Sequence, residues 1–129
     1  MRWIVRPEDL ERINKEYGNE KSIAGLAEKK RYTRYSIPKL YAVLLDKKEI
    51  RLIQLDLNLQ KKNIDVISLK GIEVLEVKGS ISKTVIIKTI DKTYRLIFRD
   101  KTAAKSIKSQ QTAILAKLEE LKYSFEYKN

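Results

Sequence analysis

Near its amino terminus, the chain has apolar residues at the spacing of a helix. Leu10, Ile13 and Tyr17 recur at spacings of three and four residues, which places their side chains on one face of a helix. Pro7 suits the first helical turn, where a missing N–H loses no helical partner, and Gly18 favours a stop. The pattern predicts a helix over 7–17.

The apolar period weakens over 19–38 and then changes from helical to strand-like. In the weak stretch, Ser22 is a suitable cap for a short helix. The apolar side of that helix would be Ile23, Leu26 and Ala27. Further along, apolar runs recur at roughly ten-residue spacing, which is typical of an antiparallel meander. The predicted strands are 40–45, 50–59, 64–69, 72–78, 84–90 and 93–99.

The second of these strand runs changes phase. Ile50 and Leu52 point to one side, whereas Ile53 and Leu55 alternate in the other register. A β-bulge produces such a change and bends the strand, so we predict a bulge within this run. The polar residues 46–49 connect the run to the preceding one as a hairpin.

A second, longer helix is predicted over 102–122, with Asp100 or Thr102 as its cap. Gln111 interrupts its apolar stripe, either as a position that faces a partner or as a buried amide with its hydrogen bonds made. The tail 123–127 alternates and is predicted to add an edge strand. The apolar stripe consists of Ala104, Ile107, Ile114, Leu118 and Leu121.

These elements predict an α+β protein. Its strongly bent antiparallel sheet of about six to seven strands, between 40 and 99, would form a small barrel or a sandwich. The long carboxyl-terminal helix would pack on the sheet, and a short helical region would precede it. The 129 residues suit one domain, because domains of about 100–200 residues are usual and no linker rich in Pro, Gly or Ser interrupts the chain. We expect a single domain over 1–129.

The charge balance points to an anionic partner. Lys and Arg number 28 and Asp and Glu 17, so the net charge is +11. Such a balance favours nucleic acid or an anionic membrane surface without deciding between them. We interpret the basic residues on the predicted strands as guards against edge pairing, with a phosphate-contacting surface as the alternative. These residues are Lys70, Lys78, Lys83, Lys88, Lys92, Arg95 and Arg99.

Missing residue types exclude several kinds of chemistry. The chain has no Cys and no His, which removes disulfides, thiolate metal sites, cysteine nucleophiles and the Ser-His-Asp triad. Its four glycines are too scattered to form a phosphate-binding glycine loop. We expect a non-enzymatic binding protein with no metal and no cofactor.

The amino terminus and the apolar runs bear on location. Glu8 and Asp9 stand where a secretory signal would need a long apolar segment. The longest apolar run, 40–45, is far shorter than the roughly 20 residues that a spanning helix requires. We expect a soluble, cytoplasmic protein.

The most distinctive segment mixes cations with aromatic rings. Single-stranded nucleic acid binding uses this combination, since cations contact phosphates and flat rings stack on bases. The alternative is a solvated loop whose tyrosines pack on the sheet. We hypothesise a small regulator that binds RNA or single-stranded DNA through this basic-aromatic segment. Its residues are Lys29, Lys30, Arg31, Tyr32, Arg34 and Tyr35.

The carboxyl half carries a family resemblance in the order of its elements. The stretch 66–74, which reads VISLKGIEV, and the hairpin 84–99 with the helix from Thr102 are similar to the second sheet and capping helix of the pleckstrin-homology-like fold, particularly its small bacterial members. The likeness runs over about 40–122 and implies the sandwich. Small RNA-binding barrels of the PUA type have a similar series of strands.

This resemblance implies an alternative function. Phosphoinositide-binding members of the family carry clustered basic residues on the first hairpin, and Lys47, Lys48 and Arg51 occupy the corresponding place here. Glu49 stands among them and would oppose an inositol phosphate. The alternative is therefore an adaptor that docks on anionic lipid or on an acidic protein through this hairpin.

Overall fold

A computed structural model describes residues 5–29, 39–56, 58–79, 82–99 and 107–128, with side chains up to 124. In this part of the chain, helix α1 (Pro7–Tyr17) precedes seven strands, and helix α2 (Lys108–Lys128) follows them. A short 3-10 helix, η1 (Leu69–Gly71), links β4 to β5. The strands are β1 (Ile23–Lys29), β2 (Lys39–Leu45), β3 (Glu49–Leu55), β4 (Lys61–Ser68), β5 (Ile72–Lys78), β6 (Lys83–Thr89) and β7 (Thr93–Phe98).

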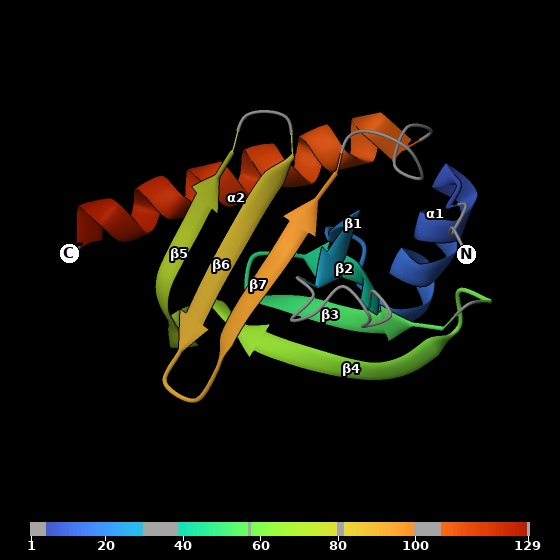
Figure 1. Ribbon diagram of the computed structural model, residues 1–129, viewed down its shortest axis with the longest axis horizontal. Helices are drawn as coiled ribbons and strands as arrows, with labels where there is room; N and C mark the ends of the chain where they lie inside the picture. Colours follow the sequence, from blue (N-terminus) through green and yellow to red (C-terminus); the bar gives the residue numbers. More distant parts are fainter. Residues whose placement is uncertain (1–4, 30–38, 57, 80–81, 100–106, 129) are drawn as a thin grey trace, which may run out of the picture.

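The strands form one antiparallel sheet in the order β4-β3-β2-β1-β7-β6-β5. Its two halves join where β1 meets β7, through the pairs Glu28↔Ile97 and Lys29↔Leu96. In the described residues β1 and β7 share only these two pairs, and Figure 1 shows β5–β7 running across the direction of β3 and β4, so the sheet bends at the junction. The predicted α+β class and bent sheet are confirmed. The barrel alternative is wrong, since the sheet is open with β4 and β5 as its edges.

Helix α1 begins and ends where the pattern predicts. Asp9 accepts a hydrogen bond from the Arg6 N–H at 2.9 Å, which satisfies a backbone donor at the start of the helix. The helix covers the outer face of β1, β2 and β3, and its Leu10 and Ile13 are buried there. The predicted amino-terminal helix is thus confirmed at 7–17.

The predicted short helix after Ser22 is wrong, because this stretch forms β1. Residues 24–27 are all buried, since α1 covers one face of the strand and the main core covers the other. A strand buried on both faces has a continuous apolar run, which periodicity alone does not separate from a helix. Ser22 itself lies in the turn before β1, where its Oγ accepts a hydrogen bond from the Asn19 N–H at 3.0 Å.

The phase change in β3 also arises because both faces of the strand are buried. Ile50 and Leu52 belong to the main core on the inner face of the sheet, whereas Ile53 and Leu55 pack beneath α1 on the outer face. The phase change does not come from a bulge, because β3 pairs with β2 without interruption from Ile50 to Leu55. The predicted run does contain a register shift of the kind that a bulge produces, opposite β4 between Gln54 and Leu55, where the strand ends.

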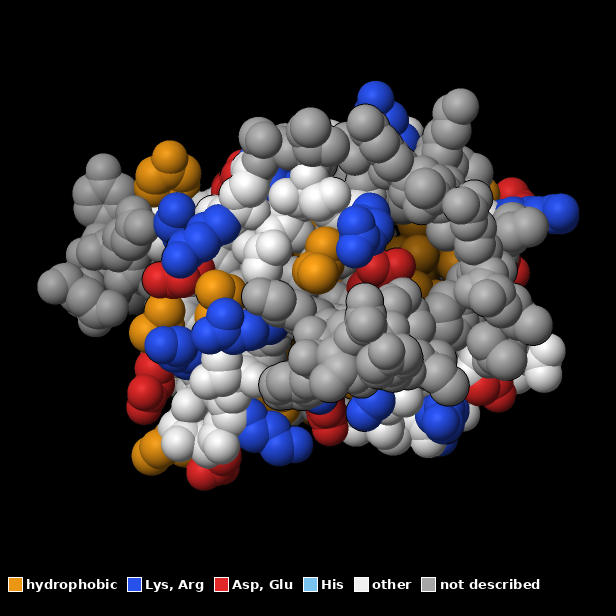
Figure 2. Space-filling view, in the orientation of Figure 1, with side chains coloured by type: hydrophobic (Ala, Val, Ile, Leu, Met, Phe, Trp, Pro, Cys, Tyr) orange, Lys and Arg blue, Asp and Glu red, His pale blue; other side chains and the backbone are white. Residues whose placement is uncertain are grey.

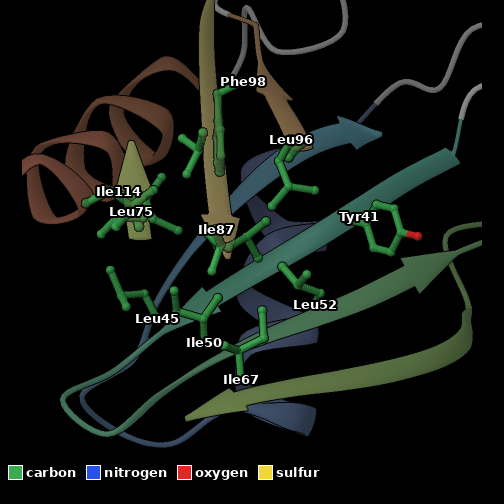
Figure 3. Packing of buried hydrophobic residues seen from close by; sticks show 14 of the residues in the cluster. Tyr41, Leu45, Ile50, Leu52, Ile67, Leu75, Ile87, Leu96, Phe98 and Ile114 are labelled. Carbon is green, nitrogen blue, oxygen red and sulfur yellow. The ribbon is translucent and has the colours of Figure 1, made fainter. Parts of the chain in front are cut away.

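The main core fills the space between the two halves of the sheet and α2. Figure 3 shows side chains from β6 and β7 meeting those from β2 and β3, with Ile114 of α2 closing one side. The residues at its centre are Leu45, Ile50, Leu52, Ile67, Leu75, Ile87, Leu96, Phe98 and Ile114. Tyr41 belongs to the same cluster but lies apart from the aliphatic side chains, towards the other end of β2.

Gln111 joins α2 to β1 by two hydrogen bonds and to the residue after β7 by a third. Its Oε1 accepts from the Leu26 N–H at 2.7 Å, and its Nε2 donates to the carbonyl oxygens of Leu26 at 2.8 Å and Arg99 at 3.3 Å. The side chain is 2% exposed, so it is the buried amide of the two interpretations. Gly25 permits this approach, because a Cβ there would lie 2.6 Å from Cγ2 of Ile114.

Helix α2 extends further than predicted at its carboxyl end. It continues to Lys128, so the predicted edge strand over 123–127 is wrong. No Gly or Pro follows Leu121 to end the helix. The predicted start at Asp100 or Thr102 lies outside the described residues. None of the helices in the described ranges is both long enough and apolar enough to cross a membrane.

Asp46 organises the predicted hairpin turn between β2 and β3. Its Oδ1 accepts hydrogen bonds from the N–H groups of Lys48 at 2.7 Å and Glu49 at 2.9 Å, and its Oδ2 accepts one from Nδ2 of Asn19 at 2.7 Å. Burial opposes the charge of the carboxylate, but these hydrogen bonds and the nearby Arg51 outweigh it. The pKa of Asp46 is therefore lowered from its ordinary value.

We predict that Gln111→Leu destabilises the protein by about 2–4 kcal/mol. The substitution keeps the size of the side chain but leaves the buried N–H and carbonyl of Leu26 without partners, at about 1–3 kcal/mol for each group. Denaturant unfolding followed by circular dichroism measures the change. Gln110→Leu, the same substitution at the half-buried neighbouring position, is the control and should stay within about 0.5 kcal/mol of the parent. Equal stabilities for the two variants would contradict the role of Gln111.

Asp46→Ala should cost about 1–2 kcal/mol of stability at pH 7, because the turn loses three hydrogen bonds to a charged acceptor. A pKa lowered by folding means that the ionised carboxylate stabilises the protein above the unfolded pKa of about 3.9. That contribution disappears as the pH falls through the folded pKa. Urea unfolding from pH 7 to pH 3 should show the two proteins converging below about pH 4. A difference that stays constant with pH would contradict this.

Candidate anion-binding site at the open end of the sheet

A pocket of about 200 Å³ lies beside the junction of β1 and β7, at the end of β2 opposite the β2–β3 turn. We call it the mouth pocket. The pocket is lined by the last residue of β1, by residues near the beginnings of β2 and β7, and by residues in the middle of β3 and β4. Its lining residues are Lys29, Tyr41, Leu52, Asp65, Lys92, Thr93, Tyr94, Arg95 and Leu96.

Strand alternation explains how an apolar floor and a polar rim come together in the mouth pocket. Leu52 and Leu96 face inward and continue the main core. Lys29 follows Ala27 at the same alternation and pairs with Leu96 across the β1–β7 junction, so it lies at the edge of that core. The apolar core ends at Lys29, and polar side chains at the rim of the mouth pocket can stay hydrated.

The rim of the mouth pocket is predominantly cationic. Lys29, Lys92 and Arg95 face one carboxylate, that of Asp65. Within the described ranges, none of the three cations forms an ion pair with an acidic side chain. Nζ of Lys92 lies 6.0 Å from the centre of the Tyr94 ring, at the limit of a cation–π contact. Among the described residues, the rim therefore has three cations to one carboxylate, an excess of positive charge.

Two tyrosines add neutral hydrogen-bond donors. Burial raises the pKa of Tyr41, and the nearby Asp65 and Tyr94 raise it further. Burial also raises the pKa of Tyr94, again with Asp65, while Lys92 acts in the opposite direction. Both phenols thus stay protonated at neutral pH and can donate to an anion. Figure 3 shows the Tyr41 hydroxyl pointing away from the aliphatic core side chains.

The basic-aromatic segment begins at this pocket. Lys29 ends β1 and pairs in register with Lys39, which begins β2, so the connection 30–38 leaves and returns at neighbouring positions. Of the predicted nucleic-acid contacts, only Lys29 is described. Lys30, Arg31, Tyr32, Arg34 and Tyr35 lie outside the described residues.

The alternative site predicted at Lys47, Lys48 and Arg51 lies at the opposite end of β2 and β3. Arg51 donates from Nε and Nη2 to Oε1 of Glu49, at 2.9 and 2.6 Å, and from Nη1 to the carbonyl of Tyr17. It therefore links β3 to the end of α1, away from the two exposed lysines of the turn. Because 23–29 is a strand, this hairpin is the second of the chain, and the first is formed by β1 and β2.

Basic side chains elsewhere do not gather in one place on the face shown in Figure 2. Lysines and arginines are spread over that face with acidic side chains between them. Several such pairs are within ion-pair distance, including Arg99 with Glu28 at 2.7 Å and Lys78 with Glu76 at 3.2 Å. The mouth pocket differs from this surface because its cations have no such acidic partners in the described residues.

Sequence patterns missed most of the mouth pocket. They did not indicate Tyr41, Asp65 or Tyr94 as site residues, and they favoured an edge-guarding role for Lys92 and Arg95, with a phosphate-contacting surface as the alternative. The available signal was the alternation that places Tyr41 and Tyr94 on the inner face of their strands. Because 23–29 was not predicted to be a strand, however, no predicted element placed β2 and β7 at the same end of the sheet.

Comparisons with known proteins bear on the fold. No protein family matches this chain, and no curated protein does so either. Among solved structures, the hSac2 domain from the human phosphoinositide phosphatase Sac2 is similar, with a TM-score of 0.52 and 10% sequence identity. The match covers 91% of this chain and 80% of that one.

The hSac2 domain has a pleckstrin-homology-like fold. Its similarity extends over nearly the whole chain, whereas the sequence resemblance was restricted to about 40–122. An identity of 10% concerns the arrangement of the backbone alone, and it does not favour the bacterial members that the sequence resemblance singled out. This chain therefore has an α+β fold of the pleckstrin-homology-like kind.

Proposed function

We propose that this protein is a non-enzymatic docking module that binds anionic lipid surfaces through the mouth pocket. The observation that carries the proposal is the set of cations, Lys29, Lys92 and Arg95, around a pocket that also contains two protonated tyrosines. Phosphate oxygens accept hydrogen bonds from both kinds of group. The sequence that follows Lys29, residues 30–38, has three further cations, Lys30, Arg31 and Arg34.

The size of the mouth pocket suits a phosphate head group. A volume of about 200 Å³ lies below the range of about 300–1,000 Å³ that is usual for drug-sized ligands. The net charge of +11 adds a long-range attraction to an anionic membrane. Phosphatase activity is a property of Sac2 and is not carried over to this chain, because the docking function proposed here requires no reaction.

Binding of RNA or single-stranded DNA has no comparable support. The hypothesis depended on stacking by Tyr32 and Tyr35, which lie outside the described residues. Tyr41 in the mouth pocket is only 8% exposed, so its ring face is not open to a base. The comparison with known structures likewise gives nucleic acid binding no support.

Vesicle binding tests the lipid proposal. We expect the protein to sediment with phosphatidylcholine vesicles that contain about 20% phosphatidylserine or a phosphoinositide, and not with phosphatidylcholine alone. Lys29→Ala/Lys92→Ala should weaken this binding about tenfold or more, since each lysine near an anionic surface contributes about 1 kcal/mol. Co-sedimentation at increasing lipid concentration measures the change.

The matched control is Lys47→Ala/Lys48→Ala, which removes the same charge from the opposite end of the sheet. It should bind vesicles within about twofold of the parent, because the field of a surface lysine decays over a Debye length of about 10 Å. Equal losses from the two double variants would mean that only total charge matters and would overturn the mouth pocket. Binding to a labelled single-stranded RNA, without binding to any anionic vesicle, would overturn lipid docking itself.

A further inference from the structure

A second pocket, of about 350 Å³, lies beside α2 at the end of the sheet opposite the mouth pocket. We call it the helix pocket. Residues from the start of β1, the β2–β3 turn, η1 and the carboxyl-terminal half of α2 surround it. They are Lys21, Ile23, Leu45, Asp46, Lys47, Leu69, Lys117, Glu120 and Leu121.

The wall of the helix pocket is aliphatic. Ile23, Leu45, Leu69 and Leu121 come from four different elements and all belong to the main core or pack against it. The pocket is thus an opening into the apolar interior, and its volume falls within the range of about 300–1,000 Å³ typical of small-molecule sites. Burying an alkyl chain there removes each of its CH₂ groups from water, which favours binding.

At Leu45 the helix pocket offers no open strand edge to a peptide. Leu45 lies in β2, which is paired on both sides, with Ile23 of β1 and Ile50 of β3. An extended peptide therefore cannot add to β2 as a further strand. The wall favours a ligand that needs no backbone hydrogen bonds, such as a single alkyl chain.

The charges at the rim select the sign of the ligand's head group. Asp46 accepts hydrogen bonds at Oδ1 within the turn and at Oδ2 from Asn19, and Glu120 pairs with Lys117 at 3.2 Å. In contrast, Lys21 and Lys47 are exposed and have no acidic partner among the residues that the structure describes. With three lysines and two carboxylates, the rim has a net positive charge.

We propose that the helix pocket binds a medium-chain fatty-acid anion. The alkyl chain lies against Ile23, Leu45, Leu69 and Leu121, and the carboxylate faces Lys21 and Lys47. This site is separate from the mouth pocket and does not depend on membrane docking. The ligand of the helix pocket is a free, monomeric amphiphile, whereas the mouth pocket is proposed to bind a membrane surface.

Decanoate is a suitable probe, used below the concentration at which it forms micelles. We expect saturable binding by isothermal titration calorimetry, with amide NMR shifts at Ile23, Leu69 and Leu121. Lys21→Ala/Lys47→Ala should weaken decanoate binding about tenfold, while binding of 1-decanol, which has the same chain and no charge, should be weak in both proteins. Lys29→Ala/Lys92→Ala is the matched control and should leave decanoate binding unchanged.

Filling the pocket provides a second, independent variant. Leu121 is only half-buried, so Leu121→Trp can place its ring in the opening without disturbing the fully buried core. This variant should lose decanoate binding and keep the circular dichroism spectrum and unfolding midpoint of the parent. No saturable binding of decanoate to the parent would overturn the proposal. It would also be overturned by decanol binding as tightly as decanoate, or by NMR shifts confined to the mouth pocket.

Discussion

In the described residues β1 pairs with β7 only at Glu28 and Lys29, so the backbone N–H and carbonyl groups that precede these positions on the β7 side of β1 need other partners. Gln111 supplies them at Leu26, where its amide takes the place of a neighbouring strand. A buried N–H or carbonyl without a partner is costly, so the bend of the sheet is stable only with α2 seated at this point. Gly25 lets the helix approach closely enough to make the contact. The bend, the position of α2 and the shape of the main core all follow from this junction.

The same junction locates both pockets. The mouth pocket lies beside the pair of Lys29 and Leu96, where the apolar floor of Leu52 and Leu96 meets polar side chains. At the other end, α2 crosses from β1 towards β5 and leaves an aliphatic gap above the β2–β3 turn. Figure 1 shows α2 running along the side of β5 and β6. Among the described residues, one end of the sheet thus presents three cations and one carboxylate around a small apolar floor, and the other presents an aliphatic wall.

Prediction from the sequence succeeded where one face of an element is buried and the other is exposed to solvent. The helix over 7–17, the β2–β3 hairpin and the strands of the second half show clear periods of this kind. It failed where both faces are buried, because β1 then lacks any period and β3 combines two overlapping ones. Gln111 was recognised as an interruption, but its partner at Leu26 lies 85 residues away and no local pattern indicates it. The mouth pocket was missed for the same reason, since it needs β1 to bring Lys29 to Leu96.

The in-register pair of Lys29 and Lys39 has a consequence for how such a module could diversify. Strands β1 and β2 are paired over seven positions, and that pairing fixes both ends of the connection between them. The entropy of closing a chain segment grows only slowly with its length, by about 0.6 kcal/mol for each doubling. Replacement or lengthening of 30–38 should therefore cost the paired strands little stability, while it changes the charge and the aromatic content of the sequence that follows Lys29. The composition of this connection can thus vary independently of the pairing that holds its two ends together.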